Sequence, residues 1–186
     1  MKLYSSRGCP YAHRTRIVLA EKKIPYELIE VDLKNKPKDL LEVNPYAKVP
    51  ALIDGDGIIY ESAIVNEYLD EKYPATRLMP NDHLLRARIR IWIDFMNSRL
   101  HPAAHDFTHD KEPEKAKERI QKHLQTLDEE MVGRQYFAGD YSLADITFIP
   151  FYTRRQRYGA TIDDSLPNLK RWGEDLIARP AVASTL

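Results

Sequence analysis

The sequence predicts a small α/β domain followed by an all-helical domain. Within the first 72 residues, short strand-like runs alternate with helix-like segments, and a Gly-containing turn separates the last two runs. After residue 82 the apolar residues recur at helical spacing only. The stretch 73–82 contains two prolines and is typical of a linker. We therefore expect one domain at residues 1–74 and a second at residues 82–186.

The composition is that of an ordinary soluble globular protein, with 43% hydrophobic and 30% charged residues. Basic and acidic residues number 28 each, so the net charge does not favour nucleic acid or a membrane surface as a partner. No apolar run reaches the roughly 18 residues of a transmembrane helix, and the N-terminus turns polar too early for a signal peptide. The single cysteine excludes an internal disulfide and a multi-cysteine zinc site. These features predict a cytoplasmic protein.

The first half contains four expected strands, which are Lys2–Ser5, Tyr26–Val31, Val49–Ile53 and Ile58–Tyr60. Helices are expected at Pro10–Lys22 and Ala63–Lys72, and an irregular segment with room for one helical turn at Lys34–Asn44. Pro10 suits the first helical position, and Ser62 suits the N-cap of the second helix. The turn at residues 54–57, Asp-Gly-Asp-Gly, is a strong hairpin signal. The order β-α-β, hairpin, helix is that of a thioredoxin-like unit.

The second half carries apolar stripes that step by three or four residues and predict core-facing helices. The stripes are Leu85, Ile89, Trp92, Met96 and Leu100, and then Ala116, Ile120, Leu124, Leu127 and Met131. Ser142 and Asp145 form a capping-box pattern at the start of a further helix, which we expect Pro150 to kink or end. Pro167 begins a last helix that contains Trp172.

Cys9 has the clearest chemistry, because it follows a strand and a turn and directly precedes a helix that begins at Pro10. The first turn of a helix presents unpaired N–H groups and the positive end of the helix dipole. Both stabilise a thiolate, the nucleophilic form of cysteine, and Arg7, His13 and Arg14 are cations close in sequence. The alternative is a small buried apolar residue, the common role of a lone cysteine. The strand-turn-Cys-Pro-helix context favours the reactive role.

The segment Cys9-Pro10-Tyr11-Ala12 resembles the redox motif of glutaredoxins, with Ala12 where a second cysteine would stand. Without a resolving thiol, Cys9 needs an external thiol such as glutathione to turn over through a mixed disulfide. Along nearly its whole length the chain also resembles the glutathione S-transferases, and most closely the omega class. The stretches that carry this resemblance are CPYAHRTRIVLAEKKIPYE, DLKNKP, NPYAKVPAL, YESAIVNEYLDEKYP and YSLADI. It implies the glutathione transferase fold, a thioredoxin-like domain followed by an all-α domain, with glutathione as co-substrate.

The resemblance also implies a set of glutathione-binding residues. Val49-Pro50 is similar to the family's cis-proline step, at which the Val49 backbone pairs with the cysteinyl backbone of glutathione. Glu61 would face the γ-glutamyl ammonium, and Ser62, with the N–H groups at the start of its helix, would hold the γ-glutamyl carboxylate. Lys36 would pair with the glycine carboxylate.

Each of these residues also has an ordinary explanation. Ser62 can be only an N-cap, Glu61 a solvated strand end, and Lys36 a surface lysine. A hydroxyl mechanism with Cys9 as a bystander is a further alternative, because other transferase classes activate glutathione with a Tyr or Ser near the first strand. Three hydroxyl residues lie in that region, and they are Tyr4, Ser5 and Ser6.

The leading functional hypothesis is a glutathione-dependent thiol transferase or reductase, of the dehydroascorbate reductase type, in which Cys9 forms a mixed disulfide with glutathione. The first alternative is a transferase that conjugates glutathione to electrophiles. The second is a non-enzymatic protein similar to bacterial stringent starvation protein A, which binds RNA polymerase. The resemblance implies a small electrophilic or disulfide second substrate and a homodimer. The balanced charge and the lack of a long apolar run predict no nucleic acid and no membrane as partners. Cys9, Lys36, Glu61 and Ser62 together favour an enzyme.

His101, His105 and His109 recur every four residues and would share one face of a continuous helix. Three imidazoles in this pattern can hold a metal, but Pro102 interrupts the start and the family does not use one. We expect no metal, and instead a wet helix face or the wall of a second-substrate pocket. The basic run at 154–157 is expected to be a solvated helix end, with a protein-partner patch as the alternative.

Overall fold

The computed structural model describes residues 1–186 and divides them into two units. The first unit consists of Met1–Arg77 together with Pro180–Leu186, and the second of Leu78–Arg179. The last residues therefore group with the N-terminal unit, which the sequence-based ranges 1–74 and 82–186 do not anticipate.

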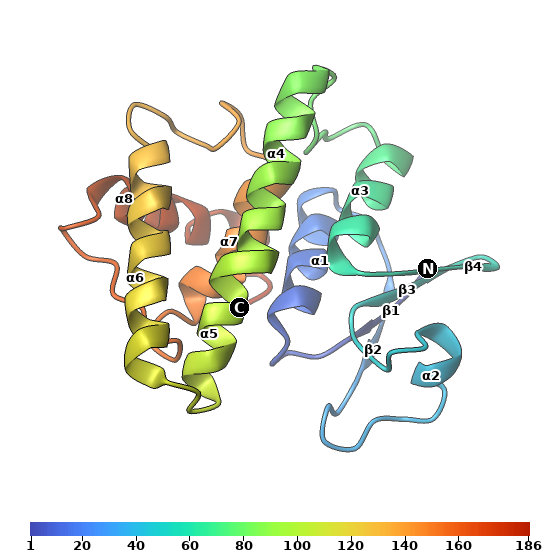
Figure 1. The fold of residues 1–186 in the computed structure, drawn as a ribbon. Helices are drawn as coiled ribbons and strands as arrows, with labels where there is room; N and C mark the ends of the chain where they lie inside the picture. The colour runs from blue at the N-terminus through green and yellow to red at the C-terminus, as the bar shows by residue number, and fades with distance from the viewer. The chain divides into compact units, whose positions relative to one another are not determined.

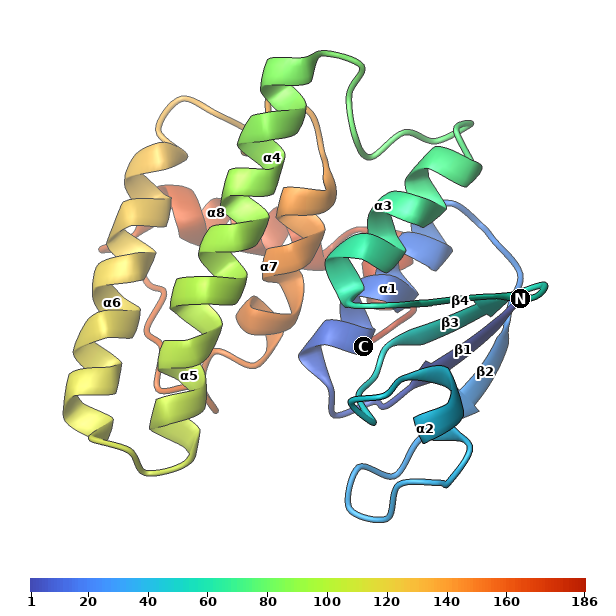
Figure 2. The same cartoon turned by 45° about the vertical axis from the view of Figure 1, so that its right-hand side comes forward.

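The first unit is built on a four-stranded sheet with the order β2-β1-β3-β4. Its strands are β1 (Lys2–Ser5), β2 (Glu27–Glu30), β3 (Ala51–Asp54) and β4 (Gly57–Tyr60). β1 and β2 are parallel, with Leu3 opposite Leu28, whereas β1–β3 and β3–β4 are antiparallel. The helices α1 (Pro10–Glu21) and α3 (Ser62–Lys72) lie side by side on the sheet, and the short α2 (Leu40–Val43) lies away from them (Figures 1 and 2). The expected thioredoxin-like arrangement is confirmed.

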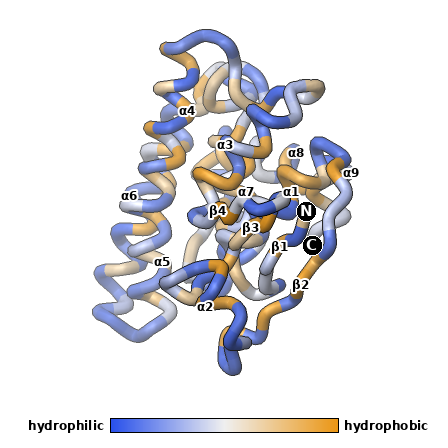
Figure 3. The backbone as a smooth tube through the Cα atoms, turned by 90° about the vertical axis from the view of Figure 1, so that its right-hand side faces the viewer, coloured by the Kyte–Doolittle hydropathy of each residue, from blue (hydrophilic) through white to orange (hydrophobic).

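The helix α1 forms the centre of this unit, because every residue from 12 to 19 is buried. Its polar side chains are tied to neighbouring elements. Arg16 Nη1 donates to Ser5 Oγ at 2.7 Å, and Thr15 Oγ1 donates to Asn66 Oδ1 of α3 at 2.9 Å. The short helix α9 (Pro180–Ala183) contacts α1 as well. The loop between β2 and α2 is hydrophilic (blue in Figure 3).

The second unit is entirely helical apart from one isolated bridge. Its elements are α4 (His83–Phe95), the π-helical segment η1 (Met96–Leu100), α5 (His101–Thr108), α6 (Pro113–Glu130), α7 (Leu143–Thr153) and α8 (Pro167–Ile177). Asp82 caps α4 through a hydrogen bond from the Leu85 N–H at 2.8 Å. The α4–η1–α5 run packs along α6, as Figure 2 shows.

Pro102 does not interrupt its helix as the sequence suggested, and Pro150 does not end its helix. Pro102 is the second residue of α5, and the wider π-helical turns of η1 come directly before it. α4, η1 and α5 therefore follow one another without a break. Pro150 lies inside α7, which continues to Thr153.

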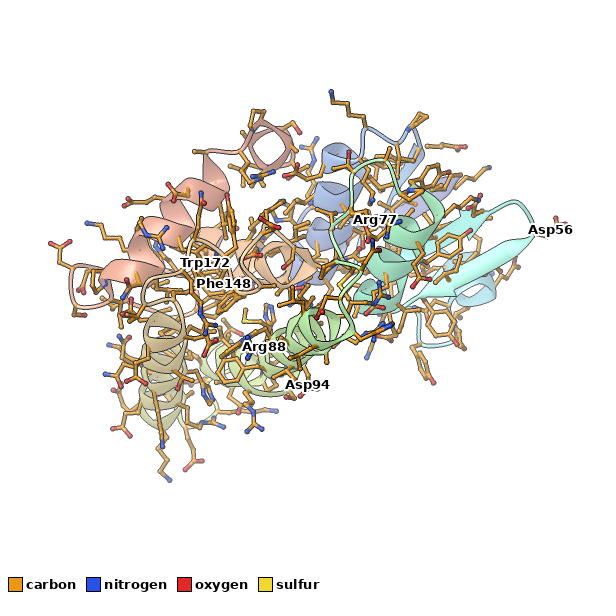
Figure 4. All side chains as sticks on the ribbon, turned by 90° about the horizontal axis from the view of Figure 1, so that it is seen from above. Asp56, Arg77, Arg88, Asp94, Phe148 and Trp172 are labelled. Carbon is orange, nitrogen blue, oxygen red and sulfur yellow. The ribbon has the colours of Figure 1, made fainter.

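The core of the helical unit is aromatic. The rings of Trp172 and Phe148 stack with centroids 4.5 Å apart, and both are labelled in Figure 4. Trp172 Nε1 donates to Asp145 Oδ1 at 3.0 Å. The expected capping box is present, because Asp145 Oδ2 accepts from both the N–H and the hydroxyl of Ser142 at 2.9 Å. Burial raises the pKa of Asp145 to about 6, against the lowering effect of these hydrogen bonds.

Candidate functional site

Cys9 lies at the N-cap of α1, with Pro10 as the first helical residue. Its backbone is extended (φ −83°, ψ 119°), and its N–H donates to Ser6 O at 3.0 Å. The Cys9 carbonyl accepts the N–H of His13 at 3.1 Å and so closes the first turn of the helix. The side chain does not cap the helix. The sulfur is therefore held at the N-terminal end of α1 by backbone geometry.

The second contact of Cys9 is with the loop before β3. Cys9 Sγ lies 3.5 Å from Val49 O, and the thiol donates to this carbonyl. The Val49–Pro50 peptide bond is cis, in agreement with the resemblance. Cys9 and Val49 both belong to one buried cluster. The structure thus brings together two of the candidate residues, which are 40 positions apart in sequence.

Glu61 and Ser62 occupy the start of α3, but not in the capping roles expected from sequence. Ser62 is the first residue of the helix and is buried, whereas the exposed Glu61 stands at the N-cap. Glu61 has φ 69° and ψ 114°, a conformation that is unfavourable for a residue with a side chain and that is concentrated at functional sites. The first helical hydrogen bond runs from Val65 N–H to Glu61 O at 2.9 Å. The N–H groups before it form the open, positive end of the helix.

The Tyr11 hydroxyl interacts electrostatically with both Cys9 and Glu61. Burial raises the pKa of the Tyr11 hydroxyl, nearby Arg14 lowers it, and Cys9 and Glu61 raise it. The guanidinium of Arg14 lies 4.9 Å from the centre of the Tyr11 ring. Tyr11 is therefore a neutral phenol beside both candidate groups. Tyr11 is not among the site residues predicted from the sequence. Its position two residues after Cys9, within the glutaredoxin-like motif, could have indicated that it lies near the sulfur.

The cations expected near Cys9 have identified contacts of their own. His13 Nε2 and Thr185 Oγ1 are 3.0 Å apart, so the His13 ring contacts the C-terminal segment. The backbone N–H of Arg7 donates to Glu30 Oε1 at 2.8 Å. The guanidinium of Arg14 lies over the ring of Tyr11, a residue that also interacts with Cys9.

Lys36 is exposed in the hydrophilic loop between β2 and α2. No ion pair or hydrogen bond joins it to Cys9, Val49, Glu61 or Ser62. The structure therefore brings Cys9 and Val49 into contact, places Glu61 and Ser62 at one helix start, and leaves Lys36 as the separate member of the candidate set.

The hydroxyls of the first strand have structural partners. Tyr4 OH donates to Asp39 Oδ2 at 3.0 Å, and burial raises the pKa of Tyr4, with a further contribution from Asp39. Ser5 Oγ accepts from Arg16. A hydroxyl that already bonds to a carboxylate or a guanidinium is a poor activator of an external thiol, which disfavours Tyr4 and Ser5 in that role.

The three histidines of the second unit do not form one group. His101 is buried and packs edge-on against Phe151, with centroids 6.1 Å apart, whereas His105 and His109 stack on each other. No group of three or more His, Cys, Asp or Glu side chains is arranged to hold a metal ion. The basic run caps the end of α7, because Arg154 donates to Pro150 O and Arg155 to Tyr152 O.

A hollow of about 580 Å³ lies in the second unit, at the corner between α5 and α6. Its lining is entirely charged and consists of Asp106, Lys111, Glu112, Lys115, Glu118 and Arg119. None of the sequence-predicted site residues lines it. No helix has the length and apolar character needed to cross a membrane.

Known proteins with similar sequences include glutathione S-transferases and a stringent starvation protein A homolog. The chain is 35% identical to "Glutathione S-transferase U19" of Arabidopsis thaliana, over 95% of this chain and 84% of the relative. It is also 35% identical to a "Stringent starvation protein A homolog" of Haemophilus ducreyi, over 86% and 76% of the two chains. Identity to "Glutathione S-transferase omega-1" of Sus scrofa is 33%, over 99% of this chain and 79% of the relative.

Structural and family comparisons agree with these similarities. A glutathione S-transferase of Methylobacillus flagellatus, solved with glutathione bound, superposes with a TM-score of 0.88 at 28% identity, over 99% of this chain and 98% of that chain. The family model for the glutathione S-transferase N-terminal domain matches residues 3–77, and the model for the C-terminal domain matches residues 91–180. The chain therefore belongs to the glutathione S-transferase family, whose co-substrate is glutathione, and it is omega-like.

Proposed function

We propose that the protein is a glutathione-dependent thiol transferase in which Cys9 is the catalytic nucleophile. The observation that carries this proposal is the position of Cys9 Sγ at the N-cap of α1, 3.5 Å from the carbonyl of Val49. A thiolate formed there is stabilised by the unpaired N–H groups and the dipole of the helix. Two of the three other candidates for thiol activation, the hydroxyls of Tyr4 and Ser5, already have partners within the fold.

Glutathione would bind along the loop and helix start that surround Cys9. The backbone of Val49, preceding Pro50, pairs with the cysteinyl part of glutathione. Glu61, which forms no ion pair in the structure, takes the γ-glutamyl ammonium. Ser62 and the open N–H groups of α3 hold the γ-glutamyl carboxylate, since a helix N-terminus favours an anion. Lys36 supplies an exposed cation for the glycine carboxylate.

The reaction needs one protein thiol and two molecules of glutathione. Cys9 thiolate attacks the glutathionyl sulfur of a mixed disulfide, forms the Cys9–glutathione disulfide and releases the other thiolate. The thiolate of a second glutathione then attacks the glutathionyl sulfur. Oxidised glutathione leaves and the Cys9 thiolate is regenerated. Ala12 cannot act as a resolving thiol, so the second glutathione is obligatory.

The test is the turnover of a small glutathione mixed disulfide by the wild type and matched variants. Cys9→Ser should abolish turnover, and mass spectrometry of the wild type exposed to oxidised glutathione should show a single adduct at Cys9. Full activity of Cys9→Ser would contradict the mechanism. Lys36→Gln should raise KM for glutathione about fivefold, since an exposed ion pair contributes roughly 1 kcal/mol. Lys34→Gln, in the same loop, is its control and should leave KM unchanged.

Conjugation of glutathione to electrophiles is the second candidate, because the chain is as similar to Glutathione S-transferase U19 as to any relative described above. A chlorinated aromatic substrate distinguishes the two activities. Faster consumption of that substrate than of the mixed disulfide, with Cys9→Ser retaining the activity, would favour conjugation. Failure to bind glutathione at all would favour a role similar to that of the stringent starvation protein A homolog.

We also propose that the protein acts in the cytoplasm as a homodimer. α4 exposes two large apolar side chains, Leu84 and Ile91, on the helix that also carries exposed Arg88 and Asp94 (Figure 4). Leu84→Glu with Ile91→Glu should convert a dimer to a monomer in light scattering after size exclusion. Val132→Glu, at another exposed apolar position, should not. A wild type that elutes as a monomer would refute the proposal.

A further inference from the structure

The most distinctive cluster outside the glutathione site is a pair of stacked histidines at the C-terminal end of α5. His105 and His109 are one helical turn apart, and their ring centroids are 3.9 Å apart with 15° between the planes. Both side chains are exposed. His101, one turn earlier, is buried against Phe151, so the pair is separate from the third histidine of the sequence pattern.

The hydrogen bonds of His109 fix which of its ring nitrogens has an available lone pair. His109 Nδ1 lies 2.9 Å from the carbonyl oxygen of His105, which can only accept a hydrogen bond. The neutral ring therefore carries its proton on Nδ1 and its lone pair on Nε2. Thr108 Oγ1 lies 3.2 Å from the same Nδ1 and steadies the ring from a second direction. An Nδ1–H bonded to a backbone carbonyl is the arrangement that commonly orients a metal-binding imidazole.

The surroundings of His105 leave its ring mobile and place a carboxylate beside it. The side chain of His105 is 57% exposed, so its ring can rotate from the stacked position toward a shared metal. Asp106 Oδ1 lies 3.9 Å from His105 Nδ1, while Asp106 Oδ2 accepts a hydrogen bond from Arg119 at 2.8 Å. The nearby carboxylate is thus neutralised by an arginine, and the imidazoles are the available ligands.

We propose that His105 and His109 form a two-imidazole site for a late first-row divalent cation, with Ni²⁺, Cu²⁺ and Zn²⁺ as the candidates. Imidazole is a preferred ligand for these ions, whereas Mg²⁺ and Ca²⁺ require oxygen ligands. The Nε2 atoms are the donors, and water fills the remaining coordination positions. The site does not depend on the glutathione chemistry proposed above, because it lies in the second unit and uses none of those residues.

The test is a calorimetric titration of the full-length chain with Ni²⁺, in a Cys9→Ser background that removes the competing thiol. One ion should bind per chain, and His105→Gln and His109→Asn should each weaken binding at least tenfold. His83→Gln and His123→Gln are matched controls in the same unit and should bind as the parent does. Thr108→Val should weaken binding about tenfold, within the range for loss of a group that orients a metal ligand.

A thermal melt gives a readout independent of calorimetry. Ni²⁺ should raise the melting temperature of the parent, because it binds only the folded arrangement, and should not raise that of His105→Gln or His109→Asn. The unliganded melting temperatures show whether each variant still folds. The proposal is overturned if no Ni²⁺ binds, if both histidine variants bind like the parent, or if only one of the two histidines matters.

Discussion

Lys22 forms a buried ion pair whose loss should be costly. Its Nζ lies 2.7 Å from Asp70 Oδ1 and donates to the carbonyl of Tyr73 at 2.8 Å, while a third bond reaches Thr76 O. The two side chains are 1% and 4% exposed. Lys22→Met removes this cation from beside the buried Asp70 carboxylate. Breaking a buried pair in this way costs about 3–5 kcal/mol, and the loss of two carbonyl partners acts in the same direction.

The assay is the thermal and urea unfolding of Lys22→Met beside Lys23→Met, an exposed control at the next position. At about 2–4 °C per kcal/mol for a chain of this size, the melting temperature should fall by roughly 10 °C for the first variant. Lys22→Met with Asp70→Leu should recover most of the loss, because it replaces the pair by apolar side chains. Equal stability of Lys22→Met and Lys23→Met would refute the reasoning.

Three further predictions concern stability. Burial raises the pKa of Asp145 from 3.8 to about 6, so the folded state binds the proton more tightly than the unfolded state. The unfolding free energy of the wild type relative to Asp145→Asn should therefore fall by about 2 kcal/mol as the pH rises from 4 to 6, and a flat difference contradicts this. Gly173→Ala should cost about 1–3 kcal/mol in urea unfolding, because the new Cβ would lie 2.1 Å from the Tyr152 ring, and Gly173→Ala combined with Tyr152→Leu should recover part of it. Thr185→Val should lower the free energy of unfolding by about 1 kcal/mol, because it removes the hydrogen bond to His13. Ser184→Ala is the control, because the Ser184 hydroxyl bonds only to the nearby Ala181 carbonyl.

Local signals predicted most of the elements and the position of Cys9. The Cys9-Pro10 step begins α1, the turn at 54–57 joins β3 to β4, and the Ser142–Asp145 pattern forms the expected box. Each of these features depends on residues within a few positions of one another, so a local stretch of sequence is enough to predict it. The helical stripes succeeded for the same reason.

The remaining features depend on tertiary contacts that no local pattern contains. Ser62 is a good N-cap by propensity, but Glu61 adopts φ 69° and takes that position. Pro102 was expected to interrupt a helix, but it lies in the first turn of α5, directly after the π-helical segment η1. The packing of α9 on α1 joins segments more than 150 residues apart, as the bond between His13 and Thr185 illustrates.

The anchoring of α1 explains how a single cysteine can be positioned without hydrogen bonds from other side chains. Cys9 itself is fixed only by backbone groups and by its contact with Val49 O. The helix behind it is tied to three different elements, since Arg16 bonds to the end of β1, Thr15 to α3, and Lys22 to the end of α3 and the segment after it. A reactive group needs a rigid support if it is to meet a bound thiol in the right geometry. In the proposed mechanism, the buried polar residues of α1 hold the helix, and the Cys9 sulfur at its N-terminus takes its position from them.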